Sequence, residues 1–143
     1  MPSTSTITRT LLGLAFLTFG LNYFFTFLPM PKDTPADALA FIMPFIGAKY
    51  MALIKSIEIA SGLALLANRF VPLALALLAP IVVGITWFHI SLEPSGLPIP
   101  LVLVVLEIAT AWFYRDAFAP MLQVRTAPAH KPSTATNRGT VAA

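Results

Sequence analysis

The chain has 143 residues, of which 57% are hydrophobic and 10% charged, and its formal net charge at pH 7 is +3. A soluble domain carries about 25% charged residues because its surface faces water, so this composition excludes an ordinary soluble domain. The absence of cysteine excludes disulfides, iron–sulfur clusters and thiolate zinc sites. The excess of positive charge is typical of the cytoplasmic loops of membrane proteins, and we do not expect a nucleic-acid partner.

Four apolar segments follow one another along the chain, and each is long enough for a membrane-spanning helix of about 20 residues. They cover residues 7–28, 48–67, 70–92 and 97–114. Residues 1–122 are therefore predicted to form one all-α domain, a four-transmembrane-helix bundle. A cleaved signal peptide is the alternative for the first segment, but its apolar run exceeds the usual length of about 7–15 residues.

Two segments outside the predicted spans have their own patterns. Thr34-Pro35-Ala36-Asp37 is a helix-start pattern and is followed by apolar residues 38–43, which predicts a short helix on the membrane surface, capped by Thr34. Residues 123–143 are rich in Thr, Ala and Pro without periodicity, which predicts a disordered cytoplasmic tail.

The distribution of basic residues predicts the orientation of the chain. With four spans, the N-terminus, the turn between the second and third spans and the tail share one side. That side holds six of the basic residues, Arg9, Arg69, Arg115, Arg125, Lys131 and Arg138. Both termini are therefore expected in the cytoplasm of a bacterial-type inner membrane.

Among the polar side chains within the predicted spans, we single out five whose burial in the bilayer is costly and needs a role. They are Asn22, Lys55, Glu58, His89 and Glu107. A rise of about 1.5 Å per residue places all five between the bilayer centre and the extracytoplasmic surface. Lys55 and Glu58 are three residues apart, so they share a helix face and are expected to form an ion pair. Glu107 has no such partner in its own span, so we expect Lys55, His89 or a hydroxyl from another helix to meet it, or else its carboxyl group to stay protonated.

Two of these residues begin nearly identical tetrapeptides, Glu58-Ile59-Ala60-Ser61 and Glu107-Ile108-Ala109-Thr110. They lie at similar depths in the second and fourth spans. This suggests two related helical hairpins about a pseudo-two-fold axis, with Glu58 and Glu107 facing each other across the bundle. Chance similarity is the alternative, because Ile and Ala are common in apolar helices.

Small and aromatic residues give two further expectations. Aromatic side chains near the span ends are expected to anchor the membrane interfaces, namely Tyr50, Trp87, Trp112 and Tyr114. Four glycines are expected to permit close approach between helices, namely Gly13, Gly20, Gly62 and Gly84.

A series of short motifs runs through the four segments in a defined order: Gly20-Leu21-Asn22-Tyr23-Phe24, Lys55-Ser56-Ile57-Glu58-Ile59 with Ser61-Gly62, Asn68-Arg69-Phe70-Val71-Pro72-Leu73-Ala74, Phe88-His89, and Glu107 followed by Trp112-Phe113-Tyr114-Arg115. In their order and spacing, over residues 7–122, the chain resembles the DoxX family of small four-helix membrane proteins. That family takes its name from a subunit of an archaeal terminal quinol oxidase, and other members are linked to oxidative-stress complexes and membrane assembly. The resemblance implies an accessory subunit of a quinone-linked or oxidative-stress membrane complex, with quinone as cofactor and with membrane lipid and redox-complex proteins as partners.

Two hypotheses about the polar residues remain open. In the first, Glu58 and Glu107 accept protons or hydrogen bonds from a bound quinone, and Lys55 and His89 polarise its carbonyl oxygen. In the second, the polar residues only hold the helices together, and the chain is a non-catalytic assembly protein. A proton-coupled transporter, which would need a dimer, is a third alternative. The sequence has two histidines, one of them in the tail, so a bis-histidine haem within the bundle is excluded, and no metal-ligand spacing occurs. Whether any reaction is catalysed stays open.

Overall fold

The structure is a computed structural model that describes residues 2–29 and 33–124, and this part of the chain contains helices and loops without strands. The predicted all-α class is therefore confirmed. One long helix corresponds to each of the four apolar segments: α1 (Thr4–Phe25), which lies three residues earlier than the predicted 7–28, α3 (Tyr50–Leu66), α4 (Val71–Ser91) and α5 (Pro98–Phe113). Shorter helices connect or follow them: α2 (Ala36–Gly47), the 3-10 helix η1 (Pro94–Gly96), α6 (Arg115–Phe118) and the 3-10 helix η2 (Ala119–Leu122). The predicted tail lies outside the described residues except for Gln123 and Val124.

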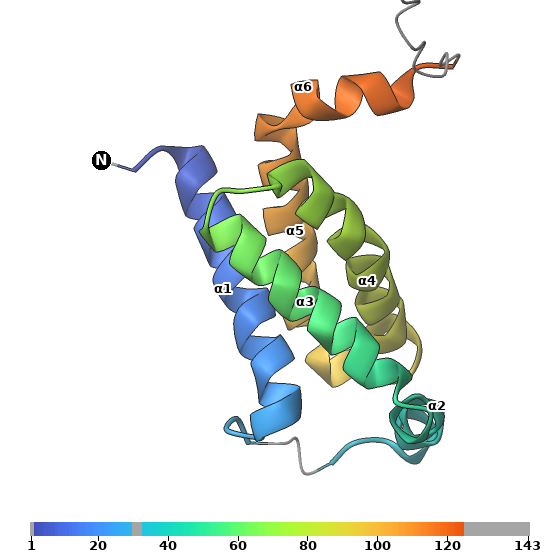
Figure 1. Cartoon of the computed structure of the whole chain (residues 1–143). Coiled ribbons are helices and arrows are strands. Elements are labelled where there is room, and N and C mark those ends of the chain that lie inside the picture. The colour runs from blue at the N-terminus through green and yellow to red at the C-terminus, as the bar shows by residue number, and fades with distance from the viewer. Residues whose placement is uncertain (1, 30–32, 125–143) are drawn as a thin grey trace, which may run out of the picture.

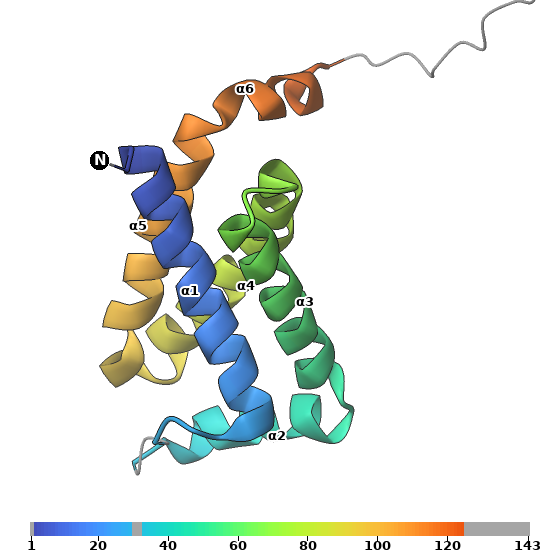
Figure 2. The same ribbon diagram turned by 60° about the vertical axis from the view of Figure 1, so that its left-hand side comes forward.

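The four long helices form a ring in which each packs on two neighbours (Figure 1). α1 and α4 both contact α3 on one side and α5 on the other. The helices run alternately in opposite directions, so the N-terminus and α6 lie at one end of the bundle and α2 lies across the other, as Figure 2 also shows. We refer to these as the α6 end and the α2 end.

Left-handed residues make the sharp joints between helices. Lys49 separates α2 from α3 with a φ of 57°, and Asn68 and Phe70 turn the chain from α3 into α4 with φ values of 53° and 54°. Prolines favour the helix starts that follow, since Pro72 lies in the first turn of α4 and Pro98 is the first residue of α5. The chain therefore reverses direction between α3 and α4 within a few residues.

Two short helices lie across the ends of the bundle. α2 makes an angle of 83° with α3, and the segment from α6 through η2 makes an angle of 80° with α5. α2 begins at Ala36, so Pro35 rather than Thr34 occupies the cap position, and the helix continues through Pro44 to Gly47. Its aromatic rings join it to the bundle, since Phe41 lies 5.9 Å from Phe88 and Phe45 lies 5.6 Å from Tyr50 between ring centroids.

The bundle has apolar side chains on both its inside and its outside. Inside, an apolar core is formed by Leu12, Phe16, Leu65, Val71, Ala74, Leu75, Leu78, Val82 and Leu103. Outside, large apolar side chains are exposed along every long helix, including Leu14, Leu53, Val83, Val105 and Ile108. Contiguous exposed apolar surface of this kind is rare on a protein that faces water.

One long helix in the described ranges, α4, is by itself long and apolar enough to cross a membrane. The number rises to three if α2 with α3, and α5 with α6 and η2, each count as one bent span. α1 is not among them, and its Arg9 and Asn22 lower its hydropathy. The length and composition of the helices establish one to three spans, so the fourth span stays a prediction.

Glycines bring α1 and α3 into close contact. A Cβ added to Gly62 would lie 2.9 Å from the carbonyl oxygen of Gly13, and one added to Gly13 would lie 3.0 Å from that of Gly62. Gly20 similarly faces Ile59. Gly84 is exposed and would meet nothing within 4 Å in the described part of the chain, so its predicted packing role is wrong.

Candidate functional site

Lys55 and Glu58 form the ion pair that their spacing predicts. Lys55 Nζ lies 2.8 Å from Glu58 Oε1 and donates to both carboxylate oxygens, the second at 2.9 Å. Glu58 is fully buried, whereas the side chain of Lys55 keeps 19% of its exposure. The pair lies within one helix, α3, and satisfies both of its charges locally.

His89 is paired with a residue that the sequence analysis did not single out. Its Nδ1 lies 2.8 Å from Glu93 Oε2 and 3.1 Å from the Glu93 carbonyl oxygen. Ser95 Oγ donates to the other carboxylate oxygen of Glu93 at 2.8 Å. The i, i+4 spacing of His89 and Glu93 is the signal that could have identified this contact. His89 is therefore engaged at the α2 end, where α4 meets η1.

Asn22 closes the end of its own helix. Its side-chain oxygen accepts a hydrogen bond from the Leu28 N–H at 2.7 Å, and its carbonyl oxygen accepts one from the Thr26 N–H at 2.8 Å. Such bonds satisfy backbone groups that a helix end leaves free. The structure thus gives Asn22 a local role at the C-terminus of α1.

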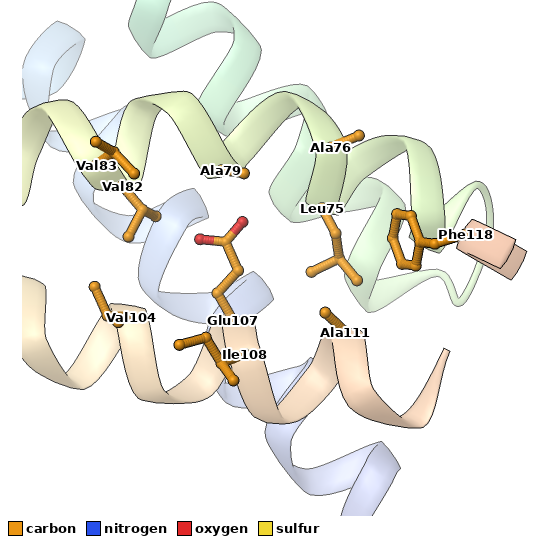
Figure 3. Close-up of a pocket in the computed structure, with 10 residues that line it drawn as sticks. All are labelled: Leu75, Ala76, Ala79, Val82, Val83, Val104, Glu107, Ile108, Ala111 and Phe118. Carbon is orange, nitrogen blue, oxygen red and sulfur yellow. The ribbon is translucent and has the colours of Figure 1, made fainter. Parts of the chain in front are cut away.

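Glu107 lies in an open groove of about 350 Å³ between α4 and α5 (Figure 3). The other lining residues are apolar, namely Leu75, Ala76, Ala79, Val82, Val83, Val104, Ile108, Ala111 and Phe118. In Figure 3 the carboxyl group points from α5 toward α4 near Ala79. Glu107 is 8% exposed, and its Oε1 is buried without a hydrogen-bond partner among the described residues. The expected contact between this oxygen and Lys55, His89 or a hydroxyl is therefore not formed.

The groove lies toward the α6 end of the bundle. Along α5, Glu107 is closer to Phe113 than to Pro98. Phe118 of α6 lines one end of the groove, and Val82, Val83 and Val104 line the other. The depth of Glu107 in a bilayer, expected between the centre and the extracytoplasmic surface, stays a prediction.

The two tetrapeptides are equivalent in burial and different in bonding. Glu58 and Ser61 are buried on α3, and Glu107 and Thr110 are buried on α5. No hydrogen bond or ion pair joins the two glutamates in the described structure. α3 and α5 lie diagonally across the ring and Glu107 lines the groove beside α4, so the facing of the two glutamates stays a prediction. Glu58 has the Lys55 ammonium, and Glu107 has no cation in the described structure. The five predicted residues therefore form separate units instead of one cluster.

A buried arginine was missed as a structural group. Arg9 of α1 is 7% exposed and donates from Nη1 to the carbonyl oxygens of Leu65 and, at 3.4 Å, Leu66. These carbonyls belong to the last turn of α3, where helix carbonyls lose their usual i+4 donors, and the Leu65 carbonyl also accepts from the Asn68 N–H at 3.1 Å. An arginine that precedes a long apolar run in the same helix is the signal that could have indicated this role.

Within residues 2–29 and 33–124, no group of three or more His, Asp or Glu residues is placed to hold a metal ion. Comparison with known proteins gives no match: no family model, no curated protein and no solved structure is detectably similar to the chain. The resemblance to the DoxX family therefore rests on the motifs alone.

Proposed function

We propose that the chain is an integral inner-membrane protein in which α1, α3, α4 and α5 cross the bilayer and both termini are cytoplasmic. Apolar side chains cover the outside of the bundle, and Arg9, Glu58 and Glu107 are buried inside it. This distribution suits a lipid environment, where charged groups face the interior of the bundle. The perpendicular helices at the two ends suit the two membrane surfaces, where amphipathic segments lie flat.

Within this membrane protein, we propose that the groove beside Glu107 binds a quinone, and that the chain is an accessory subunit of a quinone-linked membrane complex. The observation that carries the proposal is the buried, unpartnered Oε1 of Glu107 in an otherwise apolar groove. A buried polar atom without a partner costs about 1–3 kcal/mol. An intramembrane carboxyl group of this kind is by default a functional group.

A quinone matches this groove in polarity. Its chain is apolar and its ring carries oxygens, so one carboxyl group among aliphatic walls can meet it. A neutral carboxyl group can donate to a quinone carbonyl, and an ionised one can accept from a quinol hydroxyl. Glu107 could thus hold the ring and exchange a proton with it during turnover by a partner subunit. The choice of quinone rests on the DoxX resemblance.

Purification from native membranes in mild detergent tests the proposal. Quinone bound per protein is measured by mass spectrometry for the wild type, for Glu107→Leu and for the control Ala60→Leu, which changes an exposed residue of α3. We expect quinone to co-purify with the wild type and with Ala60→Leu. Glu107→Leu should lose the quinone while it still elutes as folded protein. Equal quinone content in all three would overturn the assignment.

The second candidate function is non-catalytic assembly. It is favoured by the local satisfaction of Lys55 with Glu58, of His89 with Glu93 and of Asn22 with its own helix end. These contacts stabilise the helices and their ends, and none of them needs a ligand. In this case protein partners should co-purify, and no quinone should accompany any of the three proteins.

A further inference from the structure

We propose that the groove between α4 and α5 selects lipid-soluble molecules that carry a hydroxyl group, and that they enter sideways from the bilayer. This inference rests on the proposed membrane location and deepens the proposed ligand site. It concerns the chemical class of the ligand, an alcohol or a phenol, which includes the reduced form of a quinone.

The need for a hydroxyl group follows from the atom that lacks a partner. Glu107 Oε1 is a buried oxygen, and none of the described residues donates a hydrogen bond to it. An ionised carboxylate only accepts hydrogen bonds, and a neutral carboxyl group still accepts at one oxygen. A ligand hydroxyl can therefore satisfy Glu107 in either protonation state. A ligand with only ether or carbonyl oxygens is limited to the neutral state, in which Glu107 can donate.

The walls of the groove favour a small polar head with an apolar body. Ala79 of α4 lies beside the carboxyl group, and Ala76 and Ala111 line the same groove (Figure 3). These short side chains leave room next to Glu107. A charged or strongly polar head would lose its hydration there without further polar groups to replace it.

The groove opens on the outside of the bundle, toward the lipid in the proposed orientation. Val83 is 68% exposed and Ile108 is 65% exposed, and both line the groove. A ligand dissolved in the bilayer can thus reach Glu107 between α4 and α5 without crossing the core. Phe118 closes the groove toward the α6 end, so the apolar body of the ligand is expected to point outward past Val83 and Ile108.

Two probes of the same shape test the selection. 4-Octylphenol carries the hydroxyl group, and 4-octylanisole replaces it with a methyl ether. Binding of each is measured by equilibrium dialysis to the full chain in lipid nanodiscs. We expect the wild type and Ala60→Leu to prefer the phenol by roughly tenfold, the effect of one hydrogen bond to a charged or strongly polar group. Glu107→Leu should bind both probes equally, and Ala79→Leu, which fills the groove, should bind neither.

The controls make each outcome decisive. Thermal unfolding of every variant in the same nanodiscs establishes that it is folded before binding is measured. Equal binding of phenol and anisole to the wild type would overturn the inference, as would a phenol preference that persists in Glu107→Leu. A phenol preference without co-purifying quinone would retain this inference and reject the quinone-linked function, so the two can fail separately.

Discussion

Lys55 Nζ lies within 2.9 Å of both carboxylate oxygens of Glu58, one helical turn away on α3, and the pair leaves neither charge alone. Glu107 occupies the matching position of the other tetrapeptide without a cation. The two glutamates therefore differ in what their removal should do to the stability of the protein.

Replacing Glu58 should destabilise the bundle. Glu58→Leu removes one partner of a buried ion pair and leaves the Lys55 ammonium alone, which costs roughly 3 kcal/mol. The double variant Lys55→Met/Glu58→Leu removes both charges and should recover most of this loss. Thermal unfolding in detergent micelles measures both effects. A single variant as stable as the wild type would show that Lys55 reaches water without help from Glu58.

Replacing Glu107 should increase the stability of the bundle instead of lowering it. Glu107→Leu removes a carboxyl oxygen that has no partner and leaves no other charge behind, so we expect a gain of about 1–3 kcal/mol in the free energy of unfolding. Thermal unfolding of Glu107→Leu is measured under the same conditions as that of Glu58→Leu. If Glu107→Leu is destabilising without ligand, the carboxyl group holds the helices together, and the structural alternative gains support.

The contact between Gly13 and Gly62 should not tolerate larger side chains. Gly62→Ala would force α1 and α3 apart, because its Cβ would lie 2.9 Å from the backbone oxygen of Gly13. We expect a loss of about 2 kcal/mol or more in unfolding free energy, the usual cost of overpacking. Gly84→Ala is the matched control, since Gly84 would meet nothing within 4 Å, and it should gain about 0.5–1 kcal/mol. Similar effects at the two positions would contradict the packing described for α1 and α3.

Removing the Arg9 guanidinium should weaken the α6 end of the bundle. Arg9→Met keeps much of the side-chain volume but removes the charged donor from the Leu65 and Leu66 carbonyls, of which Leu65 keeps the Asn68 N–H. The expected loss is roughly 1.5–3 kcal/mol, as for a hydrogen bond from a charged group. Hydrogen exchange should show the effect first in the last turn of α3. Uniform exchange along the helix would argue against a local cap.

The two tryptophans can report where the membrane surfaces lie. Trp87 is near the end of α4 that adjoins α2, and Trp112 is near the end of α5 that adjoins α6, and both are exposed. In nanodiscs, Trp87→Phe leaves Trp112 as the only tryptophan, and Trp112→Phe leaves Trp87, so each can be excited selectively above the absorption of the three tyrosines. We expect lipids brominated near the headgroup to quench both more strongly than lipids brominated near the chain ends. Strong quenching of either by chain-end bromine would place that helix end in the bilayer centre and contradict the proposed spans.

Local chemistry accounts for the parts of the structure that the sequence predicted. Long apolar runs indicated the four long helices, and the i, i+3 spacing of Lys55 and Glu58 indicated their ion pair. Both signals depend on residues close together in the chain. The left-handed joints were harder to predict, because Lys49 and Phe70 are bulky residues that rarely adopt positive φ.

The surroundings of Glu107 depend on helix order, which no local pattern contains. The repeated tetrapeptide suggested that Glu107 faces Glu58 across the bundle, but it could not show that the groove beside Glu107 forms with α4, a neighbour of α5 in the ring. The groove further depends on small residues of α4, a helix that carries no matching tetrapeptide. Apolar periodicity alone could not show which helix would lie opposite Glu107.

The contact of Arg9 with the end of α3 has a consequence for the order of events during synthesis. The donor emerges with the first helix, and its acceptors emerge at Leu65 and Leu66, before α4 and α5 leave the ribosome. The glycine contact between α1 and α3 also lies wholly within this stretch. α1 and α3 can therefore pack against each other as an antiparallel pair while the ribosome is still producing the second half of the chain. α4 and α5 then assemble against an existing surface, and the groove is the last feature to form.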